Sequence, residues 1–106
     1  MTLTEFAGLL NTLDYDVAQN EFPLDYNATY PYIIFEVTGS NNMMADSHVY
    51  QKVLQIDISI YSKDNADMTA QSALEQLLDE NDIPWNFEGD FDHEQYDYEV
   101  VYSVEI

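Results

Sequence analysis

The segment Asp90-Phe91-Asp92-His93-Glu94 is the part of the sequence whose residue types come nearest to a chemical site. Its three carboxylates alternate with other residues and would offer oxygen ligands of the kind that calcium prefers. The segment lacks the glycine and the terminal bidentate glutamate of an EF-hand loop, so its match to a calcium loop is weak. We therefore expect a solvated acidic loop here and assign it no metal ligand.

The other residues offer no recognisable catalytic set. His48 and His93 are predicted to lie in separate loops, and Gly39-Ser40 lacks the flanking pattern of a nucleophile elbow. With only three glycines, the chain cannot build a glycine-rich phosphate cradle. Carboxylates are so numerous that no pair stands out as an acid and a base. We expect a protein that is not an enzyme, with no catalytic residue and no cofactor.

The net charge of −19 comes from 21 carboxylates set against two lysines, Lys52 and Lys63, and no arginine. A protein that binds nucleic acid needs basic groups to neutralise phosphates, and this chain has almost none. Docking on an anionic membrane surface is excluded for the same reason. We expect neither nucleic acid nor membrane among its partners.

The carboxylates gather between residues 79 and 99, where no basic residue other than His93 interrupts them. Two interpretations stay open, a solvated face that keeps the protein soluble and a functional acidic surface. The candidate acidic surface consists of Asp79, Glu80, Asp82, Glu88, Asp90, Asp92 and Glu94.

The sequence contains no cysteine, so its fold must depend on an apolar core, as expected in a reducing compartment. Residues 1–5 lack the pattern of a signal peptide, and no apolar run approaches the ~20 residues of a membrane-spanning helix. The 106 residues are expected to form a single domain, 1–106.

Apolar periodicity predicts two helices and four strands. The first helix begins at a capping box of Thr2 and Glu5 and runs to about Leu13; the second follows a cap at Asn65 or Asp67 and ends near Asn81. Strands are expected over 31–38, 48–61, 83–87 and 96–106, with a short extended piece over 17–22 and a turn at Glu88-Gly89-Asp90. A strand over 48–61 would approach about 45 Å, so its first half should project from the core in a long hairpin.

These elements predict an α+β fold in which two helices cover one face of an antiparallel sheet of about four strands, in the order α-β-β-α-β-β. The expected core comprises Leu3, Phe6, Leu10, Ile33, Phe35, Leu54, Ile56, Ile58, Ile60, Leu74, Leu77, Leu78, Val100, Tyr102 and Val104.

Two features favour binding to protein. Nine tyrosines are many for this length, and exposed tyrosine favours protein interfaces. The hairpin tip is predicted to carry Asn41, Asn42, Met43 and Met44, and adaptable methionines in a polar loop suit docking on a neighbouring subunit. The alternative for the methionines, that one packs back under the sheet, stays open.

Several segments resemble one family when taken in order. They are 13–22 (LDYDVAQNEF), 30–35 (YPYIIF) and the strand 56–61 (IDISIY) with the helix after it. Together these segments resemble the tail-terminator proteins, also called tail-completion or head–tail joining proteins, of long-tailed bacteriophages and prophages. Asp16 and Gln19 depart from the family, where proline and tyrosine are common.

The resemblance implies a virion protein, assembled in the bacterial cytoplasm, that forms a ring. The ring, usually a hexamer, would contact itself, the tail-tube protein and the head-connector proteins. An acidic lumen would let DNA pass without holding it, because carboxylates repel phosphates. The alternative is an acidic DNA mimic that inhibits a nucleic-acid-binding host protein, and an unrelated adaptor domain is a third possibility.

Overall fold

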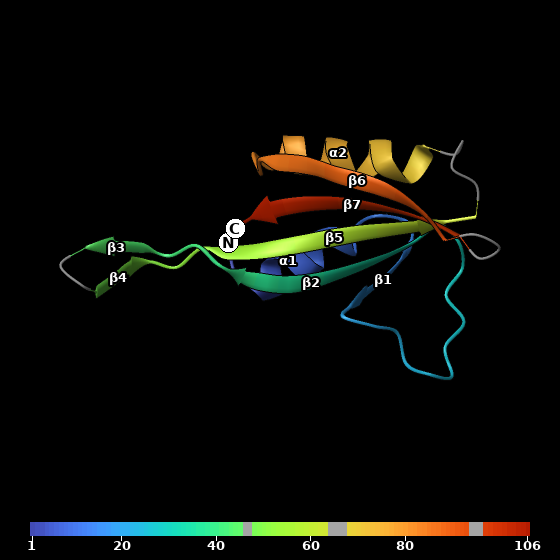
Figure 1. The fold of residues 1–106 in the computed structure, drawn as a ribbon, viewed down its shortest axis with the longest axis horizontal. Helices are drawn as coiled ribbons and strands as arrows, with labels where there is room; N and C mark the ends of the chain where they lie inside the picture. Colours follow the sequence, from blue (N-terminus) through green and yellow to red (C-terminus); the bar gives the residue numbers. More distant parts are fainter. Residues whose placement is uncertain (46–47, 64–67, 94–96) are drawn as a thin grey trace.

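The computed structural model describes residues 1–45, 48–63, 68–93 and 97–106, and for 43–45 and 48–51 only the course of the backbone. The chain forms an α+β fold (Figure 1). Its elements are α1 (Leu3–Leu10), β1 (Asp16–Gln19), β2 (Tyr32–Ser40), β3 (Met43–Ala45), β4 (His48–Gln51), β5 (Leu54–Ser62), α2 (Thr69–Glu80), β6 (Trp85–His93) and β7 (Asp97–Glu105).

Helix α1 begins at the predicted capping box. The Glu5 amide donates to the Thr2 hydroxyl at 3.1 Å, and the Thr2 amide donates to the Glu5 carboxylate at 3.0 Å. The helix ends about a turn earlier than expected, because the side chains of Asn11 and Thr12 bond to the carbonyls of Ala7 and Leu9. Such local side-chain bonds compete with the helical pattern.

The main sheet has five strands in the order β1-β2-β5-β7-β6, and it is mixed. The prediction of an antiparallel sheet of about four strands therefore missed one strand, β1, and the parallel pairing that it makes with β2. Residues 16–19 pair in parallel with β2, so that Val17 lies opposite Ile33. The segment 20–31 supplies the crossover that a parallel pair needs, and the Asn20 amide bonds to the Phe35 carbonyl at 2.9 Å.

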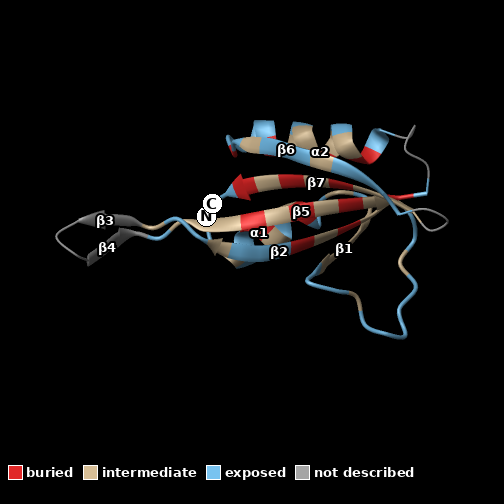
Figure 2. Cartoon of the chain, in the orientation of Figure 1, coloured by how far each residue is buried: buried red, intermediate tan, exposed pale blue. Residues whose placement is uncertain are grey.

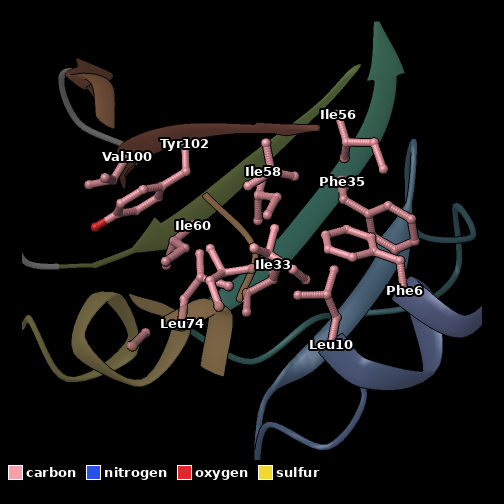
Figure 3. Packing of buried hydrophobic residues seen from close by; sticks show 14 residues of the cluster. Phe6, Leu10, Ile33, Phe35, Ile56, Ile58, Ile60, Leu74, Val100 and Tyr102 are labelled. Atoms are coloured by element: carbon pink, nitrogen blue, oxygen red, sulfur yellow. The ribbon is translucent and has the colours of Figure 1, made fainter. Parts of the chain in front are cut away.

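Both helices lie on one face of this sheet, as predicted, and the core lies between (Figures 1 and 3). In Figure 2 the buried residues form stripes across β2, β5 and β7. Twelve of the predicted core residues are buried, whereas Leu3, Leu54 and Leu77 are only partly buried against the cluster. Ala70 and Ile83 also belong to the core, although neither was among the expected core residues.

The hairpin projects as predicted, but its second arm is not one continuous strand. Strands β4 and β5 are separated at Lys52 and Val53, and β3 and β4 form a two-stranded sheet of their own. This small sheet extends beyond the main sheet at the end where the two termini lie, and the molecule measures 52 × 29 × 26 Å (Figure 1).

Strand β6 corrects the prediction of a turn and an acidic loop after Phe87. A β-bulge between Phe87 and Gly89 lets the strand continue to His93 instead of ending. Gly89 has φ 153°, a conformation that residues with a side chain rarely adopt, so the glycine permits the bulge. Asp90, Phe91, Asp92 and His93 are thus strand residues on alternating faces, while Glu94 lies outside the described residues.

Candidate functional site

The base of the projecting hairpin is held by two of the four predicted interface residues. The Asn41 amide donates to the Val53 carbonyl at 2.9 Å, and the Val53 amide donates to the Asn42 side-chain oxygen at 3.1 Å. Met43 and Met44 lie in strand β3, so these four residues form the base and one arm of the hairpin and not its tip. The methionine side chains lie outside what the structure describes.

The predicted acidic surface is exposed wherever it is described. Asp79, Glu80 and Asp82 follow one another around the end of α2, and the other described members lie on edge strand β6; α2 and β6 run along the same side of the molecule (Figure 1). The Trp85 indole nitrogen donates to Asp79 at 2.9 Å and joins the two segments. Asp79, Glu80, Asp82, Asp90 and Asp92 therefore form one acidic edge, whereas Glu88 bonds to Ser103 on the opposite face of the sheet.

A third surface, not foreseen from the sequence, is the face of the main sheet opposite the helices, which we call the uncovered face. Its side chains alternate along each strand with those of the core, and the register sets them in rows across β2, β5, β7 and β6. The three central rows are Tyr32–Tyr61–Glu99–Phe91, then Ile34–Ser59–Val101–Gly89, then Glu36–Asp57–Ser103–Asn86.

Aromatic rings follow one end of the uncovered face. The Tyr32 and Tyr61 rings stack with centroids 5.0 Å apart, Tyr30 lies 5.2 Å from Tyr32, and the His93 ring lies 6.5 Å from Tyr61. We call Tyr30, Tyr32 and Tyr61 the tyrosine row. The Lys63 ammonium lies 5.7 Å from the centre of the Tyr30 ring, within the range of a cation–π contact.

Two carboxylates accept hydrogen bonds from this row. Glu99 accepts from the Tyr61 hydroxyl at 3.1 Å and contacts the His93 Nε2 at 2.9 Å, and Asp97 accepts from Tyr30 at 2.9 Å. Burial, with the bond to Asp97, raises the pKa of Tyr30 to about 12. Burial and then the charge of Glu99 also raise the pKa of Tyr61. These phenols therefore remain neutral donors at physiological pH and are poor candidates for a base or a nucleophile.

Carboxylates also oppose one another on this face. Glu36 on β2 and Asp57 on β5 are direct cross-strand partners, and Glu88 lies close enough to raise the pKa of Asp57, after burial, which is the larger cause. Glu88 itself accepts a hydrogen bond from the Ser103 hydroxyl at 2.7 Å. We call Glu36, Asp57 and Glu88 the carboxylate band.

Neither a metal centre nor a membrane span is found in the described part of the chain. Within residues 1–45, 48–63, 68–93 and 97–106, no three acidic or histidine side chains are grouped so that they could hold a metal ion. Over the same ranges, no helix has the length and apolar character needed to cross a membrane.

A surface hollow of about 380 Å³ lies where the chain passes from α1 into β1. Asp16 contributes to it, but its carboxylate accepts the Thr29 amide at 3.0 Å, a bond that lowers the pKa of Asp16 and fastens the 20–31 segment to β1. The other lining residues are Leu13, Asp14, Tyr15, Thr29, Tyr30 and Pro31, which supply no nucleophile with an adjacent base. The hollow thus lacks the features of an active site.

The three surfaces with a distinct physical character are therefore the hairpin, the acidic edge and the uncovered face. Comparison of the chain with models of known protein families and with curated protein sequences finds no match.

Proposed function

We propose that the chain is a structural subunit of a long-tailed bacteriophage or prophage, which forms a ring that caps the tail tube and joins it to the head. The observation that carries the proposal is a hairpin of almost no net charge that projects from a polyanionic body. Its segment 41–52 contains one carboxylate, Asp46, and one ammonium, Lys52, so the net charge of −19 resides on the remainder of the chain.

Repulsion between copies explains why such a hairpin matters. Two bodies that each carry a charge near −19 repel one another, and at physiological salt this repulsion extends over roughly 8 Å. The hairpin extends past the end of the main sheet, where it meets another subunit without adding to the repulsion. Its backbone edges are also available to pair with a strand of a neighbour.

A contact of this kind joins two different surfaces, the hairpin of one copy and the body of the next. Such head-to-tail contacts generate closed rings when the rotation between copies closes and open filaments when it does not. The resemblance of segments 13–22, 30–35 and 56–61 to tail-terminator proteins favours the closed form, a hexamer, with tail-tube and head-connector proteins as its other partners.

The acidic edge suits the wall of a channel through which DNA moves. Its carboxylates are exposed and repel phosphates, so DNA would release no counterions on contact and gain no affinity. We therefore place the acidic edge, Asp79, Glu80, Asp82, Asp90 and Asp92, toward the lumen; Glu88, the remaining described residue of the expected acidic surface, lies on the opposite face of the sheet. The body surfaces between neighbouring subunits must then bury apolar groups to offset the remaining repulsion.

The test is the mass and shape of the intact protein over a salt series. We expect monomers at low salt and, above roughly 0.3 M salt, rings visible by negative-stain microscopy with a matching mass by light scattering, because salt screens the carboxylates. A protein that stays monomeric at every salt and concentration would contradict the ring. If that monomer also displaced nucleic acid from basic proteins, the DNA-mimic alternative would replace it.

A further inference from the structure

The uncovered face has a pattern that neither ring formation nor DNA passage requires. It combines a row of tyrosines with a band of three carboxylates, and the two are separated by the small or apolar side chains of Ile34, Ser59 and Val101. Successive rows on one face of a sheet are about 6.6 Å apart, so the tyrosine row and the carboxylate band are separated by about 13 Å.

The carboxylate band is electrostatically unfavourable as it stands. Glu36 and Asp57 are direct cross-strand partners, an arrangement that destabilises a sheet when the charges are alike. The chain's own cations do not offset it: Lys52 lies beside the hairpin, and the described contact of the Lys63 ammonium is with Tyr30, at the far end of the tyrosine row. A cation from outside the chain would relieve the repulsion.

The chemistry of the uncovered face restricts the class of molecule that can supply this cation. Nucleic acid and anionic lipid carry the same sign of charge as the band, and an apolar surface would bury its carboxylates without partners, which is costly. A second copy of this chain is also a poor partner, because it has no arginine and only two lysines. A basic segment of a different protein fits both the negative charge of the carboxylate band and the extent of the uncovered face.

Arginine fits better than lysine. Its planar guanidinium pairs with carboxylates through two parallel hydrogen bonds and stacks on aromatic rings, whereas lysine offers a compact, strongly hydrated charge. The Lys63 ammonium over the Tyr30 ring shows that a cation is already accommodated at one end of the tyrosine row.

We propose that the uncovered face binds an arginine-rich segment of a partner protein, with guanidinium groups paired to Glu36, Asp57 and Glu88 and packed against the tyrosine row. The segment runs along the strands, from the carboxylate band to the tyrosine row, and so contacts both features. Binding involves the single subunit, so it does not depend on the ring proposed above.

The test uses fluorescently labelled hexa-arginine and hexa-lysine peptides, titrated by anisotropy against the full chain at a salt concentration where it is monomeric. The key variant is Glu36→Gln/Asp57→Asn. Its matched control is Glu80→Gln/Asp82→Asn, which removes the same two charges from the acidic edge, where both residues are exposed. We expect hexa-arginine to bind about threefold to fivefold more tightly than hexa-lysine.

The key variant should weaken hexa-arginine binding about tenfold and the control less than about twofold, because a screened charge acts mainly on its neighbours. Tyr32→Leu should reduce the preference for arginine while leaving hexa-lysine binding unchanged. Equal losses from the two double variants, or equal binding of the two peptides, would show diffuse attraction to a polyanion and overturn the proposal. Neither result bears on whether the intact protein forms rings.

Discussion

Glu36 and Asp57 stand directly opposite each other on β2 and β5, on the face of the sheet that the helices leave uncovered. Two like charges in this position destabilise the pairing of the strands. Asp57 is also unfavourably placed for another reason, because burial and, after it, the charge of Glu88 raise its pKa.

Asp57→Asn should therefore stabilise the protein. An aspartate whose pKa is raised by folding lowers stability once the pH rises above its ordinary pKa of 3.8, so the gain should be present at pH 7 and vanish under acid conditions. Asp57 is only partly buried and its charge is partly screened by solvent, so we expect only a few tenths of a kcal/mol. Urea unfolding at pH 7 and pH 3, with Asp25→Asn at an exposed loop position as the control, measures it; destabilisation at pH 7 would contradict the account.

The helix α2 should contribute to stability chiefly through its buried leucines. Leu74→Ala should cost about 2–5 kcal/mol, because Leu74 is fully buried against the sheet. Leu77→Ala is the matched comparison and should cost clearly less, since Leu77 is only partly buried. Denaturant unfolding of both variants measures the difference, and equal losses would argue against the packing of α2 described above.

The capping box of α1 should be visible in both stability and pH dependence. Thr2→Ala should cost about 1 kcal/mol, and Thr2→Ser, which keeps a hydroxyl, much less. The bonds from Thr2, that of its backbone amide first, lower the pKa of Glu5. The stabilisation from Glu5 is therefore complete above its ordinary pKa of 4.5 and is lost as the pH falls through the lowered value. Glu5→Gln should flatten this part of the stability–pH profile, and an unchanged profile would contradict the assignment.

The core could be predicted from the sequence because its signal is local. Ile56, Ile58 and Ile60 alternate with polar residues and are all buried, and the α1 stripe contributes Phe6 and Leu10 as expected. Alternation of this kind can be read from one strand at a time, because it depends only on which side of that strand faces the helices.

The features that could not be predicted from the sequence depend on contacts between residues that are far apart in the chain. Strand β1 has four residues and forms only because the parallel partner β2 lies beside it, and Gly89 was read as a turn although it forms a bulge. The rows of the uncovered face require the register of four strands, which no single segment specifies. The β2–β5 pairing alone would have given Tyr32 opposite Tyr61 and Glu36 opposite Asp57, but not their neighbours on β7 and β6.

Double-stranded DNA should not bind this protein. A 30-base-pair duplex should show no gel shift at about 0.1 M salt, because the chain offers two lysines against 21 carboxylates. The hexa-arginine peptide serves as the positive control for a folded, binding-competent sample. A salt-sensitive shift of the duplex would contradict both the acidic lumen and the charge argument.

The central claim, that the hairpin drives assembly, is tested most directly by sedimentation velocity of the intact chain beside a variant in which residues 42–52 are replaced by Asn-Gly. The two ends are already joined by the bond from the Asn41 amide to the Val53 carbonyl, and a two-residue turn suits such a pair. The deletion removes Asp46 together with Lys52, so the net charge stays at −19. We predict that the intact chain shifts from monomer to ring as salt rises, while the shortened chain keeps a cooperative thermal transition and sediments as a monomer throughout. A shortened chain that still forms rings would contradict the claim.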